Sequence, residues 1–198
     1  TDLCCQGPRR ARQAAAAPSR GGLARITQAP SDAHEAVKPR SRPNVTRTWT
    51  VYLSGEIHSD WREQIAAGAK GASLPVQFTS PVTHHESSDD CGVAILGPED
   101  APFWKDHKGA MVNAIRTRTL IGAADIVVVR FGDKFRQWNA AFDAGFAAAL
   151  GKPIVVVHPE EFTHALKEVD AAALAVARDP EQVVALLSYV IDGRLTRT

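Results

Sequence analysis

Apolar residues between positions 48 and 191 gather in short continuous runs that are rich in Val and Ile. Runs that do not alternate with polar residues are typical of strands buried on both faces of a parallel sheet. Helical signals separate these runs, so the pattern predicts strands and helices in alternation. The predicted strands cover residues 48–53, 75–79, 125–131, 154–157 and 174–177.

Residues with known preferences for helix ends locate the predicted helices. Asp60 and Asn139 are suited to cap the helices that follow them, and Asp179 with Pro180 marks the start of the last helix. Gly151 suits the left-handed backbone position that follows a helix end. The predicted helices cover residues 61–70, 110–123 and 140–150, with a fourth that begins at residue 180.

The segment between the second strand and the helix over residues 110–123 is predicted as a long connection. It contains several residue types that bind metals, but they have no regular spacing on one element, so no metal site is expected. A mobile loop that covers a binding pocket is the preferred interpretation. The residues concerned are His84, His85, Glu86, Asp89, Asp90 and Cys91, with Pro81 before them.

The order of elements predicts a single flavodoxin-like, Rossmann-like α/β domain over residues 48–198, with about five parallel strands and helices on both faces. In such sheets a ligand binds beyond the carboxyl ends of the strands, where the strand order reverses. The loops expected to meet there are residues 55–60, 132–139 and 158–161.

The chain has 198 residues, of which 44% are hydrophobic, and this is enough for one sizeable core. No apolar run approaches the length that spans a bilayer, which predicts a soluble protein without a membrane partner. The three cysteines form no even disulfide framework and no metal-ligand spacing. Their pattern favours a reducing compartment.

Charge divides the chain into two regions. Residues 1–47 carry nine Lys and Arg against three Asp and Glu, a net +6, whereas residues 48–198 carry fourteen against nineteen, a net −5. The acidic balance of the second region argues against a nucleic-acid partner. The first region lacks hydrophobic periodicity and is predicted as a disordered extension, and its Arg- and Ala-rich composition equally fits an organelle transit peptide. The expected location is therefore the cytoplasm, or an organelle matrix or stroma if the extension is a transit peptide.

Asp143 is the first candidate for chemistry. It falls in or near the first turn of the helix predicted over residues 140–150, among Ala, Phe and Gly residues. The positive end of a helix stabilises a carboxylate as the anion. Such a group is suited to act as a nucleophile or to hold a sugar hydroxyl. The alternative is that Asp143 only complements the helix dipole.

The turn after the first strand is a second candidate, with Gly55, Glu56, His58 and Arg62. A strand leads there into the start of a helix, where free backbone N–H groups form a natural anion site. His58 and Arg62 would add positive charge, which makes the turn a candidate for binding a 5′-phosphate. The turn lacks the glycine patterns of dinucleotide- and nucleoside-triphosphate-binding loops. The alternative is a solvent-exposed turn in which Trp61 packs on the core.

Further candidates for substrate binding lie on the helices around the expected site. Asn113 and Arg116 are three residues apart and share a helix face, so they are placed to contact a ligand together. The alternative for both is a solvated helix surface. Trp138, next to Asn139, offers an aromatic face on which a base could stack.

Four motifs in this order resemble the nucleoside 2-deoxyribosyltransferase superfamily, most closely its YtoQ-like branch. They occupy residues 51–62, 113–118, 124–129 and 138–146, and the first contains the unusual pattern Ile-His-x-Asp-Trp-Arg. The resemblance spans residues 48–191. It implies a flavodoxin-like fold, a small-molecule nucleoside or nucleotide as the partner, no organic cofactor or metal, and assembly into a homo-oligomer.

The resemblance also implies roles for individual residues. In the family, a carboxylate on the middle helix attacks the anomeric carbon of a nucleoside and displaces the base, and Asp143 stands at the matching position. The family usually has Glu there, so Asp143 is one methylene shorter. Tyr52 matches a strand tyrosine whose hydroxyl orients the nucleophile by a hydrogen bond. Without the resemblance, Tyr52 is equally well interpreted as a core residue.

A second departure concerns the acid that protonates the leaving base. Family members commonly have an Asp six residues before the nucleophile, where this chain has Gln137, which cannot donate an acidic proton. Asp133, His58 and Glu56 are candidates to replace it, since each lies on a loop at the expected edge of the sheet.

The favoured hypothesis is an enzyme that transfers or hydrolyses the N-glycosidic bond of a (deoxy)nucleoside or its 5′-phosphate through a carboxylate nucleophile. The alternative is a non-catalytic nucleotide-binding domain that kept the pocket and lost the acid. A phospho-acceptor receiver domain is disfavoured, because Gly55 and Glu56 replace the acidic pair expected after the first strand.

Overall fold

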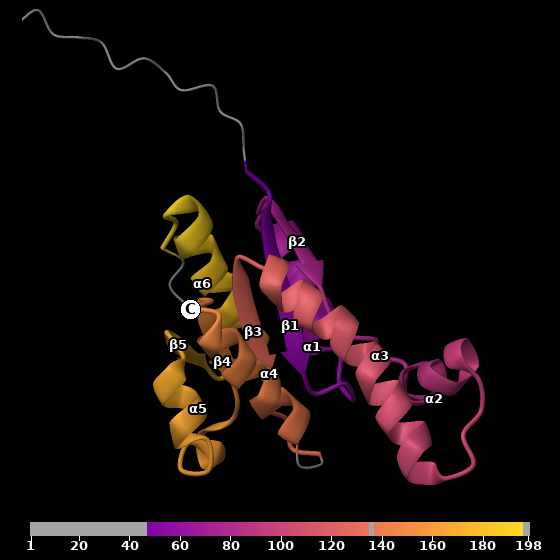
Figure 1. The fold of residues 1–198 in the computed structure, drawn as a ribbon. Coiled ribbons are helices and arrows are strands. Elements are labelled where there is room, and N and C mark those ends of the chain that lie inside the picture. Colours follow the sequence, from indigo (N-terminus) through magenta and orange to yellow (C-terminus); the bar gives the residue numbers. More distant parts are fainter. Residues whose placement is uncertain (1–46, 135–136, 196–198) are drawn as a thin grey trace, which may run out of the picture. The chain divides into compact units, whose positions relative to one another are not determined.

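Five parallel strands form one sheet in the order β2-β1-β3-β4-β5 (Figure 1). The structure is a computed structural model that describes residues 47–134 and 137–195. The sheet confirms the predicted flavodoxin-like α/β fold, and its strand order reverses between β1 and β3. Nearly all of the extension predicted for residues 1–47 lies outside the described residues. The strands are β1 Trp49–Gly55, β2 Val76–Thr79, β3 Ile126–Arg130, β4 Ile154–Val157 and β5 Ala175–Ala177.

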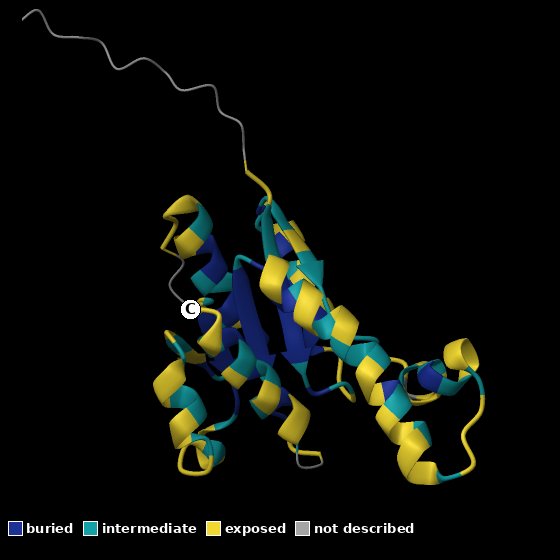
Figure 2. Ribbon diagram, in the orientation of Figure 1, coloured by how far each residue is buried: buried dark blue, intermediate teal, exposed yellow. Residues whose placement is uncertain are grey.

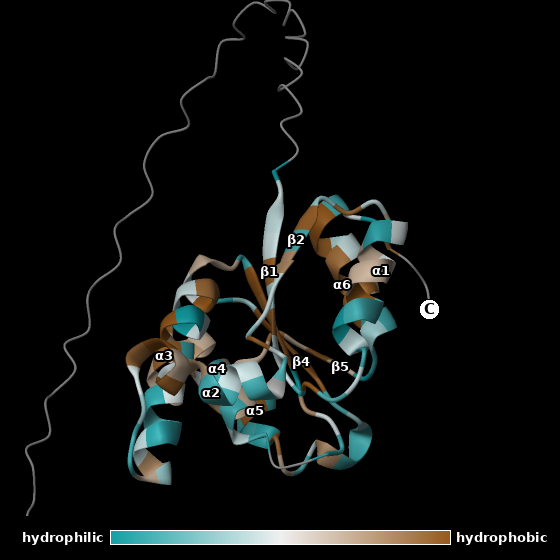
Figure 3. Cartoon of the chain, turned by 90° about the vertical axis from the view of Figure 1, so that its right-hand side faces the viewer, coloured by the Kyte–Doolittle hydropathy of each residue, from teal (hydrophilic) through white to brown (hydrophobic). Residues whose placement is uncertain are grey.

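Helices cover both faces of the sheet. Figure 3 shows α1 and α6 on one side of the strands, and α3, α4 and α5 on the other. Within residues 47–134 and 137–195, no helix combines the length and the apolar character needed to cross a bilayer. The helices are α1 Trp61–Gly71, α2 His85–Leu96, α3 Pro102–Ala123, α4 Trp138–Ala149, α5 Lys167–Ala172 and α6 Pro180–Asp192, with a 3-10 turn at Glu160–Phe162.

The strand β1 contributes side chains to two separate cores, because successive side chains of a strand point to opposite faces of the sheet. Val51 and Leu53 pack with residues of α1 and α6, whereas Tyr52 packs with residues of α3 and α4. Figure 2 shows β1 and β3 as buried elements between the helices. Each fully buried aliphatic side chain contributes about 1.5–3 kcal/mol to folding, so both faces help to hold the sheet together.

Several of the predicted helix ends are confirmed. Asp179 accepts a hydrogen bond from the backbone N–H of Gln182, and Pro180 is the first residue of α6. Gly151 has a φ of 66° after the end of α4, as its position predicted. Asp60 precedes α1 as expected, although its carboxylate accepts from the side chain of Gln64 rather than from the helix backbone.

The prediction that Asn139 caps α4 is wrong. The helix begins at Trp138 and its cap position is Gln137, which makes no side-chain capping bond. Asn139 is therefore the second residue of the helix, and Asp143 lies beyond the first turn. The amide of Gln137 instead binds the backbone of Gly132 in the preceding loop.

The prediction of a long connection before residue 110 is also wrong, because this segment contains α2 and the first two turns of α3. The two helices cross at Gly92 and Gly109. A Cβ added to Gly92 would lie 2.4 Å from the backbone nitrogen of Gly109, so the backbones approach more closely than side chains allow. Glycine is a weak helix former, and the polar start of α2 adds no apolar period. The short helix α5 was likewise not predicted.

Candidate active site

A cavity of about 840 Å³ opens at the carboxyl end of β1, beside the reversal of strand order. Its walls come from the loop after β1, from α2 and α3, and from the first turns of α4. Tyr52, Arg62 and Asp133, all predicted site residues, are not among its lining residues. The predicted residues that do line it are Gly55, Glu56, His58, Asn113, Arg116, Trp138, Asn139 and Asp143.

Asp143 is half-buried in the wall of this cavity, in the second turn of α4. The hydroxyl of Ser54 donates a hydrogen bond to its Oδ2 at 2.5 Å. Burial raises the pKa of Asp143 above its ordinary value, and the hydrogen bond from Ser54 acts in the opposite direction. The sequence predicted a carboxylate stabilised by the helix start. That effect falls off within the first turn, and here burial is the largest influence.

Ser54 was missed in the sequence, although a signal for it existed. It lies on β1 two positions after Tyr52, so both side chains point to the α3 and α4 face. Ser54 is fully buried, and a buried hydroxyl requires a hydrogen-bond partner. The alternation of β1 thus identifies Ser54 as a residue that faces α4, but it does not identify Asp143 as its partner.

Tyr52 does not make the hydrogen bond that the resemblance implied. Its hydroxyl is buried without a hydrogen-bond partner of normal geometry among the described residues. Burial raises the pKa of Tyr52 to about 12; Thr117 acts in the opposite direction, and the nearby charge of Asp143 makes a smaller contribution to the rise. Tyr52 therefore lies close to Asp143, but Ser54 is the residue that holds the carboxylate.

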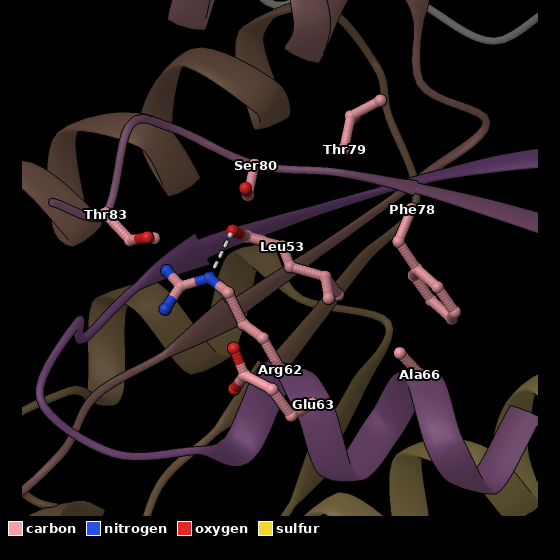
Figure 4. Close-up of a pocket in the computed structure, with 8 residues that line it drawn as sticks. All are labelled: Leu53, Arg62, Glu63, Ala66, Phe78, Thr79, Ser80 and Thr83. Atoms are coloured by element: carbon pink, nitrogen blue, oxygen red, sulfur yellow. Dashed lines mark hydrogen bonds between the residues drawn. The ribbon is translucent and has the colours of Figure 1, made fainter.

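Arg62 faces the opposite side of the sheet from the main cavity. Its guanidinium donates to the backbone carbonyls of Leu53 at 3.2 Å, Gly55 at 3.0 Å and Glu56 at 2.5 Å. Figure 4 shows it in a smaller cavity of about 220 Å³ with side chains of β2 and α1 around it. Burial lowers the pKa of Arg62 to about 10, and Glu56 opposes this shift. Contrary to the prediction, Arg62 braces the β1–α1 turn and is not placed to bind a phosphate in the main cavity.

The rest of that turn is fixed by side chains as well. Trp61 is buried and its indole N–H donates to the carbonyl of Glu56 at 2.8 Å. This confirms the interpretation in which Trp61 packs on the core. Glu56 is also buried, with its carboxylate bonded to the hydroxyl of Ser59 and to the backbone N–H of His58. His58 itself is exposed at the cavity.

Asn113 and Arg116 share a face of α3, as predicted. Their side chains connect α3 to α2 and to the segment after β2. The amide of Asn113 donates to the carbonyl of Ser88 in α2 at 2.9 Å, and Arg116 donates to the carbonyl of Ser80 at 3.1 Å. Both residues are therefore more than a solvated helix surface. They hold α2 and the segment after β2 against α3 and also line the cavity.

The start of α4 forms the outer rim of the cavity. Trp138 is 72% exposed there, which leaves its ring accessible to a flat ligand. Gln137 donates from its amide to the carbonyls of Gly132 at 3.2 Å and Lys134 at 2.8 Å, and its amide oxygen accepts from the N–H of Gly132. Asp133 is exposed outside the cavity. Gln137 thus has a structural function at the position where the family commonly has an acid.

The residues of metal-binding type lie in the segment that was predicted as a long connection. The structure places them at the start of α2 and in its first turns. His84 precedes the helix, and its imidazole accepts from the N–H of Ser87, so it caps α2. In the part of the chain that the structure describes, no three His, Cys, Asp or Glu side chains are grouped closely enough to hold a metal ion.

Comparison with known proteins places the chain in a family. The model of a family described as nucleoside 2-deoxyribosyltransferase YtoQ matches residues 52–191. The chain belongs to this family. A relative, the uncharacterized protein YtoQ of Bacillus subtilis (strain 168), is 41% identical over 142 residues, which cover 72% of this chain and 96% of the relative. The family predicted from the four motifs is therefore confirmed.

Two solved structures are similar to this member of the YtoQ family. A conserved protein from Enterococcus faecalis V583 has a TM-score of 0.50 and 14% identity, over 73% of this chain and 99% of that one. A 2-deoxyribosyltransferase from Bacillus psychrosaccharolyticus has a TM-score of 0.45 and 18% identity, over 68% of this chain and 90% of that one. At such identities the similarity concerns the fold alone.

Proposed function

We propose that this protein cleaves the N-glycosidic bond of a (deoxy)nucleoside or its 5′-phosphate, by transfer or hydrolysis, with Asp143 as the nucleophile. The observation that carries the proposal is the Asp143 carboxylate, half-buried in a cavity at the reversal of strand order and bonded by one oxygen to Ser54. Membership of a nucleoside 2-deoxyribosyltransferase family supports the choice of substrate.

The proposed reaction has two steps. An oxygen of Asp143 attacks the anomeric carbon, the carbon–nitrogen bond breaks, and its electron pair leaves with the base, which takes up a proton. A second base or water then forms a bond to the anomeric carbon and gives up a proton, the ester bond breaks, and the carboxylate is released. Ser54 holds Oδ2, so Oδ1 is the oxygen for the attack. The same hydrogen bond favours the ionised form, which the attack requires.

His58 is the proposed donor of the proton that the leaving base takes up. Of the three residues considered for this function, Asp133 lies outside the cavity, and both oxygens of Glu56 are engaged by its own loop. His58 lies at the cavity and is exposed. Histidine is the side chain that most often transfers protons in general acid catalysis.

The decisive experiment compares Asp143→Asn with Asp133→Asn, an identical change at a nearby Asp outside the cavity. We expect wild type and Asp133→Asn to release base from a panel of nucleosides, and we expect Asp143→Asn to lose at least about a thousandfold in rate, as removal of a nucleophile does. A 2-fluoro-arabino nucleoside should add the mass of its sugar to wild type and not to Asp143→Asn. Equal rates for wild type and Asp143→Asn would refute the assignment.

The alternative function, a non-catalytic nucleotide-binding domain, is favoured by one observation. Gln137 occupies the position of the family's acid and is bonded to the loop around Gly132. Such a protein would bind nucleosides or nucleotides with saturable affinity and show no base release. Calorimetric titration of the same panel therefore separates the two functions.

We further propose that exposed apolar side chains of α3 contact a second copy of the chain, because the family resemblance implies a homo-oligomer. Phe103, Trp104 and Ile115 are each more than half exposed on this helix. The rings of Phe103 and Trp104 contact each other, and exposed apolar side chains that lie together commonly mark protein interfaces. A monomeric mass in light scattering at micromolar concentration would contradict this proposal.

A further inference from the structure

The carboxylate of Glu56 lies on the donors of its own loop. Its Oε1 accepts from the backbone N–H of His58, and its Oε2 accepts from the hydroxyl of Ser59 at 2.5 Å. The Nε of Arg130 lies 3.8 Å from Oε2. Glu56 is only 5% exposed although it is a charged residue. A carboxylate buried to this degree requires hydrogen-bond donors and a nearby cation. The backbone N–H of His58, the hydroxyl of Ser59 and the guanidinium of Arg130 fulfil this requirement.

The position of Glu56 is fixed by packing as well as by hydrogen bonds. A Cβ added to Gly132 would lie 2.6 Å from Cγ of Glu56, so the glycine leaves the space that the glutamate stem fills. The carbonyl of Glu56 accepts from Trp61 and Arg62. The backbone and the side chain of Glu56 are thus both held at the loop.

The donors that Glu56 occupies are those that a phosphate would use. The loop leads from β1 into α1, and backbone N–H groups before a helix start are a common binding site for phosphate oxygens. A phosphate that approached this loop would meet the negative charge of a carboxylate that already occupies its donors, and like charges repel each other. Arg62, the cation expected to attract it, is turned to backbone carbonyls on the other face.

The loop is close to the proposed nucleophile. Ser54, which binds Asp143, lies two residues before Glu56, and both Asp143 and Glu56 line the same cavity. A sugar with its anomeric carbon at Asp143 would therefore share the cavity with this loop. A carboxylate has about four lone-pair sites, so Glu56 retains capacity to accept a bond from a sugar hydroxyl.

We propose that Glu56 is a specificity-determining residue that admits a sugar with a free 5′-hydroxyl and rejects the 5′-phosphate. Its carboxylate occupies the place of the phosphate within the protein itself. This inference rests on the proposed function, because it chooses nucleosides over nucleotides as the substrate of the same cavity.

The experiment uses Glu56→Ser, which opens the loop, and Glu56→Gln, which removes the charge and keeps the size. Glu63→Gln is the matched control, since Glu63 is exposed on α1 and does not line the main cavity. Each protein is titrated calorimetrically with a 2′-deoxynucleoside and with its 5′-monophosphate. Inorganic phosphate is titrated separately while the amide resonance of His58 is followed by NMR.

For wild type and Glu63→Gln we expect the nucleoside to bind more than about tenfold more tightly than the monophosphate, as a like-charge contact predicts. This preference should fall by at least about tenfold in Glu56→Gln and Glu56→Ser. Inorganic phosphate should shift the His58 amide in Glu56→Ser and not in wild type. Thermal melting identifies any variant that fails to fold. If Glu56→Ser does not fold, the comparison of wild type with Glu56→Gln tests the proposal.

The inference is overturned if wild type binds the monophosphate as tightly as the nucleoside, or if both Glu56 variants keep the wild-type preference. Failure of the proposed function gives a different result. If neither wild type nor the variants bind any nucleoside, but inorganic phosphate binds to Glu56→Ser alone, Glu56 still occupies the anion-binding loop and the proposed function is refuted.

Discussion

The two faces of the sheet differ in how completely they are covered. On the face of α1 and α6, Trp61, Ile65 and Leu187 are fully buried. On the other face, α3 runs beyond the sheet and carries α2 on its far half (Figure 1). Met111 and Ile115 on α3 remain exposed, and the larger cavity opens on this side.

The charged side chains on the two faces of the sheet also differ in how many hydrogen bonds they make. Arg62, between β1 and α1, donates to three backbone carbonyls. Asp143, on the opposite face, accepts from one hydroxyl, and no ion pair with it is seen among the described residues. A charge held by several hydrogen bonds fixes the backbone around it, whereas a carboxylate with one hydrogen bond in a cavity retains reactivity. We infer that the first face supplies stability and the second supplies chemistry.

The largest effect on stability is expected on the closed face. Leu187→Ala removes a fully buried side chain, which should lower the free energy of unfolding by about 2–5 kcal/mol. The control Ile95→Ala, at a residue that is 68% exposed on α2, should change it by less than about 0.5 kcal/mol. Urea unfolding measures both. Equal losses would mean that the two faces are equally covered in solution.

Ser54→Ala tests the open face with a smaller change. It leaves the half-buried carboxylate without its donor, which should cost about 1–3 kcal/mol. Because the hydrogen bond lowers the pKa of Asp143, its loss should raise that pKa, and the acidic limb of the rate profile should move to higher pH. Carboxyl NMR measures the pKa without catalysis.

Ser188→Ala is the matched control for this variant. Ser188 is buried on the closed face, where its hydroxyl donates to the carbonyl of Val184. Its loss should leave the pKa of Asp143 unchanged. If both serine variants move the pKa equally, the shift reflects general loosening of the fold and not the bond from Ser54.

The strands and most helix ends were predictable because their signals are local. Runs of Val and Ile, a capping Asp179 and a terminal Gly151 act on neighbouring residues in the chain. The helix α2 was not, because its contact at Gly92 depends on the backbone of Gly109. Such an approach has no periodic signal in the sequence.

The site was predictable to the same extent. The resemblance identified Asp143 and the β1–α1 turn, and both belong to the cavity. The bond from Ser54 joins residues that are 89 positions apart, and the inward turn of Glu56 depends on the space left by Gly132. The sequence therefore indicated which residues gather at the site but not how they bind one another.

Asp143→Asn should have a still smaller effect on stability, and in the opposite direction. Burial raises the pKa of Asp143 above its ordinary value of 3.8. Its contribution to stability is therefore fully present below the unfolded pKa and is lost as pH rises through the folded pKa. The Asn variant lacks this loss, so it should melt at a higher temperature than wild type at neutral pH. The difference should close below about pH 4. A difference that persists unchanged in acid would exclude ionisation as its cause.

Tyr52→Phe should have the smallest effect, although Tyr52 is as deeply buried as Ser54 and shares its side of β1. Its hydroxyl makes no hydrogen bond of normal geometry among the described residues. Removal of an unpaired buried hydroxyl leaves no partner unsatisfied, so the free energy of unfolding should fall by less than about 0.5 kcal/mol or should rise. The pKa of Asp143 should stay constant, because burial and the bond from Ser54 account for its shift, in contrast with the rise expected for Ser54→Ala. Urea unfolding and carboxyl NMR on the two variants side by side test this contrast. A loss of more than about 1 kcal/mol in Tyr52→Phe, together with a raised pKa of Asp143, would show that Tyr52 holds the carboxylate after all.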